Sequence, residues 1–316
     1  MILFIKIQKK MEKNLNYIKL NPGWITGFSD GEASFSVSVS YSESSSTNYT
    51  FIPRYAIELK DTDLNVLYKI QDFFNGAGKI YLIKNKGHAV YVVSKIHDLH
   101  NIIIPHFVNY PLLTIKRIAF LFFKEIIYLM YNKEHLNIKG VNAIINSRLY
   151  MNKIVTVENL KDKIIHLPIK LAEINPLNVN DITVDWFVGF TDAEGCFFLN
   201  IRPNKKKTNF WVSPIFSIAQ HSRDALLFDL LIEFLGGGFI CKENNKDVVR
   251  YRAEKLSFII STIIPLFDNN PLQSKKIKEF LDFSIACKLK NNKLHLTEEG
   301  LSKIKAIKNN MNTKRN

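Results

Sequence analysis

The feature that most constrains this chain is an internal repeat. Residues 24–35 read WITGFSDGEASF and residues 186–197 read WFVGFTDAEGCF, at an offset of 162. Later matches keep the same order: residues 55–57 with 216–218, Asp63 with Asp224, and residues 109–112 with 269–272. The offset falls only from 162 to 160, as small loop insertions and deletions produce. The chain therefore consists of two copies of one folding unit.

The repeat divides the 316 residues into segments of ordinary domain size. We expect an N-terminal extension over 1–16, a first unit over 17–130 and a linker with helical stretches over 131–180. The second unit then occupies 181–316 and ends in a C-terminal helix. A hydrophobic content of 47% is enough to give each unit its own core.

Each copy has the same pattern of helix, hairpin, helix, hairpin, helix. From 34 to 41 serines alternate with Phe35, Val37, Val39 and Tyr41, which is typical of an antiparallel strand with one buried face. In the second copy Phe197, Leu199 and Ile201 are expected to point inward. This pattern predicts an α+β fold built from two αββαββα units.

The repeated motif itself is predicted to be a helix with a stripe of small residues. Gly27 and Gly31 are four residues apart, as are Gly189 and Ala193. Such stripes let two helix backbones approach closely, so we expect the two motif helices to pack on each other across a pseudo-twofold axis. The alternative is that each stripe packs against the sheet of its own unit.

Each predicted motif helix ends in a carboxylate, Glu32 or Glu194. If the helices are parallel, both carboxylates lie at helix C-termini, where the helix dipole is also negative. A hard divalent cation such as Mg²⁺ would reverse this repulsion, and paired carboxylates that hold it suggest phosphodiester hydrolysis. The alternative is two unrelated surface glutamates. Asp30 and Asp192 lie on another side of the helix and are interpreted as structural.

Charge and composition narrow the classes of partner. Lys and Arg number 43 and Asp and Glu number 29, so the net charge is +14 and the partner is expected to be a polyanion. A basic protein without such a partner is the alternative. Three dispersed cysteines make neither a disulfide framework nor a zinc site, and no apolar run is long enough to cross a membrane.

Taken together, the two motifs make the sequence resemble the LAGLIDADG homing endonucleases. The motif copies are residues 25–33 and 187–195, and the likeness is to the single-chain, two-repeat kind encoded by organellar group I introns. The resemblance implies a monomer whose antiparallel strands form a saddle that sits on double-stranded DNA. Ala33 stands where this family usually has glycine, and its small methyl group is expected to leave activity intact.

The resemblance also implies roles for individual residues. Glu32 and Glu194 match the residues that bind catalytic metals, with help from the carbonyls of Gly31 and Ala193; Mg²⁺ is expected, Mn²⁺ or Ca²⁺ can take its place, and Ca²⁺ is expected not to support cleavage. Gln220 matches a residue that positions solvent, and its counterpart Leu59 predicts an asymmetric site. Lys116 and Lys276 match lysines near the cleavage centre, which could stabilise phosphate charge in the transition state; an ordinary backbone contact or a solvated helix face is the alternative for each.

The outward strand faces are the predicted DNA-reading surface, because a two-stranded ribbon fits the major groove. Lys84 and Lys86 are expected on one face of a strand, as are Arg250 and Arg252, and Lys205 to Lys207 at a hairpin tip. The full set of predicted DNA contacts is Ser36, Ser38, Ser40, Lys84, Lys86, Asn200, Arg202, Asn204, Lys205, Lys206, Lys207, Arg250 and Arg252. The two copies differ here, which predicts a long target that is not a true palindrome.

The leading functional hypothesis is a metal-dependent, site-specific DNA endonuclease that cuts both strands. The alternatives are a maturase that binds its host intron RNA and a DNA-binding protein that has lost cleavage. The presence of both Glu32 and Glu194 favours the nuclease. The absence of an import signal and a composition rich in Lys, Asn and Ile suit a mitochondrial gene translated in place.

Overall fold

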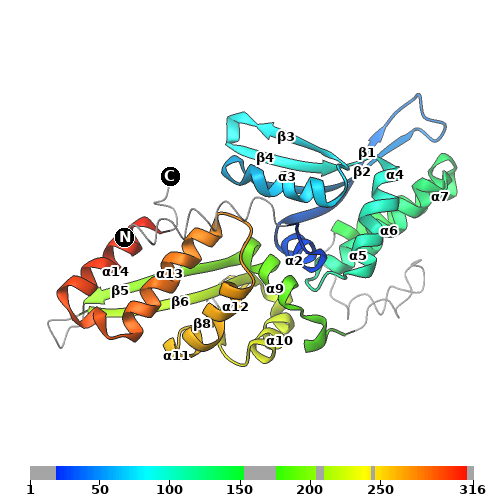
Figure 1. Ribbon diagram of the computed structural model, residues 1–316. Coiled ribbons are helices and arrows are strands. Elements are labelled where there is room, and N and C mark those ends of the chain that lie inside the picture. The colour runs from blue at the N-terminus through cyan, green and yellow to red at the C-terminus, as the bar shows by residue number, and fades with distance from the viewer. Residues whose placement is uncertain (1–18, 153–175, 204–209, 243–245, 312–316) are drawn as a thin grey trace.

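Two units of the same architecture follow one another along the chain (Figure 1). The structure is a computed structural model, and it describes residues 19–152, 176–203, 210–242 and 246–311. The predicted N-terminal extension over 1–16, residues 153–175 of the predicted linker, and the predicted DNA contacts Asn204, Lys205, Lys206 and Lys207 lie outside these residues.

The first unit begins with the motif helix. Its elements are α2 (Pro22–Glu32), β1 (Ala33–Tyr41), β2 (Tyr49–Lys60), α3 (Leu64–Phe73), β3 (Lys79–Ile83), β4 (His88–Val93), α4 (Ile96–Asp98), α5 (Ile104–Asn109), α6 (Lys116–Tyr131) and α7 (Ile138–Asn152). The sequence analysis predicted the helices and hairpins from α2 to β4 and a final helix after the second hairpin, which is α6. It did not predict the helical segment at 96–109.

The second unit repeats this order. Its elements are α9 (Val184–Glu194), β5 (Gly195–Pro203), β6 (Phe210–His221), α10 (Ala225–Leu235), β7 (Phe239–Lys242), β8 (Val248–Ala253), α11 (Leu256–Phe258), α12 (Ile264–Asn269), α13 (Lys276–Asn291) and α14 (Glu298–Asn310). The expected α+β class with two repeated antiparallel units is confirmed.

Each unit holds a four-stranded antiparallel sheet, ordered β1-β2-β4-β3 in the first and β5-β6-β8-β7 in the second. The helices α3 and α6 contact the first sheet, and α10 and α13 contact the second (Figure 1). Alternate residues point into the core beneath them, and Tyr55, Tyr91 and Phe216 are completely buried. Serines 34, 36, 38 and 40 of β1 are exposed, which agrees with the expected alternation.

Two details of the predicted strands are wrong. Lys84 and Lys86 do not lie on a strand face, because residues 84–86 form a short 3-10 turn that joins β3 to β4 and ends at Gly87 in the left-handed conformation. Tyr41 is 66% exposed, because β1 runs past the part of the sheet that the core covers.

The motif helices α2 and α9 pack directly on each other between the two sheets (Figure 1). A methyl group on Gly27 would lie 1.9 Å from the carbonyl oxygen of Trp186, and one on Gly189 would lie 2.1 Å from that of Trp24. A methyl group on Gly31 would lie 2.3 Å from the β-carbon of Ala193. The small-residue stripes therefore meet each other. Gly27 and Gly189 face the backbone of the opposite helix, and Gly31 faces the methyl group of Ala193.

The packing of helix α7 bears on where the first unit ends, which the sequence analysis expected at residue 130. Helix α7 packs on α6, just as α14 packs on α13 at the end of the second unit. Lys133 and Lys293 also occupy equivalent left-handed positions, with φ of 62° and 60°. We therefore propose to extend the first unit to Asn152, which places the linker between α7 and α9.

None of the described helices is both long and apolar enough to cross a membrane.

The close contact of α2 with α9 predicts a large effect of one added methyl group. Gly27→Ala places that methyl group against the Trp186 carbonyl and forces the helices apart, at an expected cost of about 3 kcal/mol in unfolding free energy. Denaturant unfolding monitored by circular dichroism measures this cost.

Gly76→Ala is the matched control, because a β-carbon there meets nothing within 4 Å. Its φ of 78° costs about 1 kcal/mol by itself. An equal loss of stability in both variants would contradict the close helix contact.

Candidate active site at the joined helix ends

The two motif helices end side by side, and their terminal carboxylates approach each other. Gly31 of α2 lies under the side chain of Glu194: a β-carbon on Gly31 would be 3.0 Å from Cγ and 3.5 Å from Oε1 of that glutamate. Glu32 is the next residue on α2. Both glutamates are half-buried, so the site concentrates negative charge where water is partly excluded.

Burial raises the pKa of both carboxyl groups above the ordinary value. For Glu32 the charge on Glu194 raises the pKa further, while Lys276 and Lys116 oppose the shift. For Glu194, Lys116, Lys276 and a hydrogen bond from Gln220 oppose the effect of burial. The folded protein therefore holds two carboxylates in a place that disfavours their charge.

Two lysines reach the same helix ends from outside the motif. The Lys116 ammonium donates to the carbonyl oxygen of Gly31 at 2.6 Å and to that of Ser29 at 3.3 Å. Lys276 repeats this with the carbonyl oxygens of Ala193 at 3.0 Å and Thr191 at 3.1 Å. Burial lowers the pKa of both lysines, and nearby carboxylates oppose that shift.

Asp30 is a structural residue, as the sequence analysis expected. Its carboxylate accepts hydrogen bonds from the backbone N–H groups of Leu113 and Thr114, from the Thr114 hydroxyl, and from Trp186 Nε1 of the other unit at 2.8 Å. The side chain is completely buried. It therefore joins the motif helix, the turn before α6 and the opposite unit.

Asp192 makes the equivalent set of bonds in the second unit. It accepts from the backbone of Gln273 and Ser274, from the Ser274 hydroxyl, and from Trp24 Nε1 at 2.8 Å. The expected structural role of both aspartates is confirmed, because each carboxylate accepts four hydrogen bonds.

The two halves of the site are not chemically equal. Gln220 Nε2 donates to Glu194 Oε1 at 3.0 Å. Leu59 occupies the equivalent place on β2 and offers no hydrogen bond. Next to Leu59 on β2, Glu58 instead bonds to His88 of the adjacent strand β4, with 2.8 Å between Oε1 and Nδ1.

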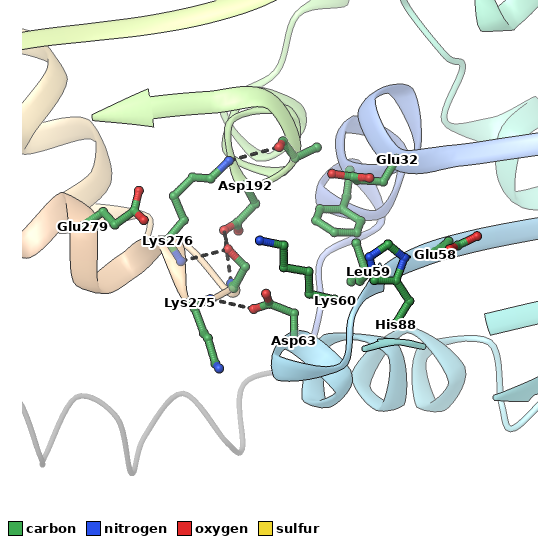
Figure 2. A pocket seen from close by; sticks show the side chains of 13 residues that line it. Glu32, Glu58, Leu59, Lys60, Asp63, His88, Asp192, Lys275, Lys276 and Glu279 are labelled. Atoms are coloured by element: carbon green, nitrogen blue, oxygen red, sulfur yellow. Dashed lines mark hydrogen bonds and ion pairs between the residues drawn. The ribbon is translucent and has the colours of Figure 1, made fainter. Parts of the chain in front are cut away.

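A cavity of about 640 Å³ opens between the units beside these residues. Figure 2 shows Glu32, Leu59 and His88 on one side of it and Lys276 and Glu279 on the other. Both units therefore contribute charged side chains to one hollow at the joined helix ends.

The outer sheet faces carry most of the predicted DNA contacts. Ser36, Ser38 and Ser40 are exposed on β1, and Asn200 and Arg202 are exposed on β5. Arg250 and Arg252 lie on one face of β8, opposite the buried Tyr251, and Arg252 forms an ion pair with Glu254 at 2.6 Å. Strand β6 lies between β8 and β5, and its register with both puts Arg250 and Arg252 on the same sheet face as Asn200 and Arg202.

Sequence reasoning missed the outer residues of the partner strands. Arg54 of β2 pairs with Ser36, and Trp211 of β6 pairs with Arg202, so both share the outer face. Trp211 is 56% exposed. The same alternation was present in these strands, but without the pairing register their two faces could not be assigned.

The donor atoms at the helix ends suit a hard divalent cation. They are carboxylate oxygens of Glu32 and Glu194 and backbone carbonyl oxygens of Gly31 and Ala193, and oxygen ligands select Mg²⁺ or Ca²⁺ over softer metals. Within the described ranges no group of three or more His, Cys, Asp or Glu side chains could hold a metal. Any cation here would therefore also use carbonyl oxygens, water or phosphate oxygens.

Comparison with known proteins identifies a family that this chain matches. The family model described as LAGLIDADG endonuclease matches residues 25–127 and 187–287, which include both motif helices. "Probable intron-encoded endonuclease 2" of Neurospora crassa is 34% identical over 301 residues, 92% of this chain. "Probable intron-encoded endonuclease 3" of the same organism is 31% identical over 95% of this chain. The chain spans 65% and 56% of the length of these two relatives.

A solved structure shares the whole fold. The homing endonuclease I-SmaMI, bound to an uncleaved DNA target in the presence of calcium ions, superposes with a TM-score of 0.84 at 32% identity. The match covers 93% of this chain and 99% of that one.

The raised pKa of Glu32 predicts a pH-dependent gain in stability when its charge is removed. Protonation is favoured in the folded state, so the penalty is absent below the ordinary value of 4.5 and grows as pH rises through the raised pKa. Without divalent metal, Glu32→Gln should raise the unfolding free energy by ~0.5–1 kcal/mol at neutral pH, after allowance for solvent screening.

Urea unfolding in the presence of a chelator measures this gain in unfolding free energy, and the gain should vanish at about pH 4. Glu43→Gln, on the exposed β1–β2 turn, is the matched control. It should leave the unfolding free energy unchanged both at neutral pH and at low pH. A loss of stability in Glu32→Gln at neutral pH would show that the lysines outweigh burial and repulsion.

Proposed function

This chain belongs to the LAGLIDADG endonuclease family, and we propose on that premise that it is a site-specific, divalent-metal-dependent endonuclease of double-stranded DNA. One observation carries the proposal: Glu32 and Glu194, each with a lysine beside it, converge where the two sheets meet. Binding of nucleic acid alone does not require these two glutamates, so the presence of both favours the nuclease.

The residues at the helix ends have separate roles in the proposed hydrolysis. Glu32 and Glu194 would hold Mg²⁺ through carboxylate oxygens. The carbonyl oxygens of Gly31 and Ala193, which accept from Lys116 and Lys276, would contribute only through their second lone pair. A bound Mg²⁺ polarises a phosphoryl oxygen and makes water more acidic. Lys116 and Lys276 place positive charge where the phosphate becomes more negative in the transition state. Gln220 orients solvent against Glu194 from a fixed amide.

Two half-sites in one chain suit cleavage of both strands by a monomer. The half-site beside Gln220 and the half-site beside Leu59 differ, so the two strands are expected to be cut at different rates. The outer sheet faces also differ, with serines on β1 and Asn200 and Arg202 on β5. This difference supports a long target without true palindromic symmetry.

The biological setting follows from the relatives and the composition. The two Neurospora relatives are named as intron-encoded endonucleases. We therefore infer that this chain is encoded in an intron, acts in intron homing, and is translated in the mitochondrion.

The proposal predicts that both glutamates are needed for cutting and not for binding. A supercoiled plasmid library with randomised inserts is incubated with the protein and Mg²⁺, and cleaved inserts are sequenced to define the target. On that target, Glu32→Gln and Glu194→Gln should each lower double-strand cleavage by at least about 100-fold, while the dissociation constant in Ca²⁺ stays within a few-fold.

Glu58→Gln is the matched control, because Glu58 lines the same cavity on an exposed strand position. It should retain double-strand cleavage. A wild-type protein that binds a selected DNA and never cuts it would reject the nuclease. Binding to the host intron RNA, with a gain in splicing, would then favour the maturase.

The outer sheet face predicts two distinct classes of binding variant. Arg202→Ala, on the exposed face of β5, should weaken binding by ~1–3 kcal/mol and relax specificity at one base pair. Lys84→Ala, at the β3–β4 turn, should weaken binding to all sequences equally and reduce the salt slope by about 1. Fluorescence anisotropy over a salt series on single-base target variants measures both. Equal effects on all base pairs for both variants would contradict base reading by Arg202.

A further inference from the structure

Asp63 and Asp224 occupy equivalent places in the two units and use their carboxylates in an unusual way. They are the N-cap residues of α3 and α10, where an aspartate commonly accepts an N–H of its own helix. Neither makes such a bond here. Each instead accepts a backbone N–H from the opposite unit.

The bonds cross between the units in both directions. Asp224 of the second unit accepts the backbone N–H of Ile115 in the first unit, at 2.7 Å. Asp63 of the first unit accepts the backbone N–H of Lys275 in the second unit, at 3.3 Å. Figure 2 shows the second of these bonds at the edge of the cavity.

The amides held in this way come directly before the two active-site lysines. At the start of α6 the N–H groups of Leu113 and Thr114 bind Asp30, that of Ile115 binds Asp224, and that of Lys116 binds the Thr114 hydroxyl. The turn before α13 repeats this order with Asp192, Asp63 and Ser274. The residue next to each lysine is thus the one that the opposite unit holds.

We propose that Asp63 and Asp224 are positioning residues that act across the interface, each fixing the start of the helix that carries the lysine of the opposite unit. This inference rests on the proposed function. Lys116 reaches the Gly31 carbonyl over 2.6 Å, so a small rotation of the first turn of α6 moves its ammonium away from the helix end. Each half-site is then fully ordered only when the other unit is docked.

The two bonds are unequal, which gives the proposal an internal comparison. Asp224 is 7% exposed and its bond is short. Asp63 is half-buried and its bond is longer, so water can replace it at lower cost. Loss of Asp224 should therefore disturb Lys116 more than loss of Asp63 disturbs Lys276.

Strand-resolved cleavage separates a positioning role from simple adhesion between the units. Single-turnover cleavage in Mg²⁺ is followed on the selected duplex, with a different label on each strand. Lys116→Met and Lys276→Met first identify the strand that depends on each lysine. Asp224→Ala should then slow the Lys116-dependent strand by about 10- to 100-fold more than the other strand. Asp63→Ala should bias cleavage the opposite way, by about threefold.

Conservative and control variants complete the set. Asp224→Asn retains an acceptor oxygen and should recover most of the lost rate. Asp229→Ala on α10 and Asp61→Ala in the turn before α3 remove the same charge from exposed neighbours and should leave the strand ratio unchanged. Equal slowing of both strands by Asp224→Ala, or failure of Asp224→Asn to recover the rate, would overturn the proposal.

Amide hydrogen exchange tests the contact without relying on cleavage. In Asp224→Ala the Ile115 amide should exchange at least about tenfold faster than in the wild type and in Asp224→Asn, with the core strands unchanged. Unchanged protection of this amide would overturn the proposal even in an active enzyme. If the wild type does not cleave at all, the proposed function fails, and the exchange data still decide whether the contact across the interface orders the lysine helix.

Discussion

Direct backbone contact between two glycine-bearing helices determines the rest of this structure. Gly27 and Gly189 each face a tryptophan carbonyl of the opposite helix, and no side chain fits between them. This contact sets the spacing of the two sheets and brings Glu32 beside Glu194. The same tryptophans donate their indole N–H groups to Asp192 and Asp30, so the helices are joined by buried hydrogen bonds as well as by close packing. The active-site geometry is therefore a property of the interface and of neither unit alone.

The helix ends hold charge that the fold itself opposes. Burial and mutual repulsion raise the pKa of Glu32, and burial lowers the pKa of Lys116 and Lys276. The ammonium groups partly compensate for the carboxylates, yet they bond to backbone carbonyls and leave carboxylate oxygens available. Such a site is less stable than an apolar one of the same shape, and a stability cost of this kind is typical of functional sites.

Much of this arrangement could be predicted from the sequence because the chain contains two copies of the same unit. The repeat and the alternation in β1 identified the units, and the stripe of small residues at Gly27 and Gly31 correctly indicated helix-on-helix packing. Lys84 and Lys86 were misplaced, because alternate lysines look the same on a strand and in a tight turn. The outer position of Arg54 depends on strand register, and the bond from Ile115 to Asp224 joins residues 109 apart that no local pattern links. The periodicity of a helix or strand can be recognised in one sequence. Contacts between the two units can be identified only once their relative placement is known.

The reciprocal packing of α2 and α9 also governs how such a chain can change. A bulkier residue at Gly27 or Gly189 displaces the partner helix. Substitutions in one motif helix therefore limit which residues the other helix can accept. The outer faces of β1 and β5 have no such tie, and they already differ at every position from Ser36 with Phe198 to Ser40 with Arg202. Duplication inside one polypeptide thus lets the outer face of each sheet diverge separately while the contact between α2 and α9 stays fixed, a freedom that a symmetric dimer of identical chains does not have.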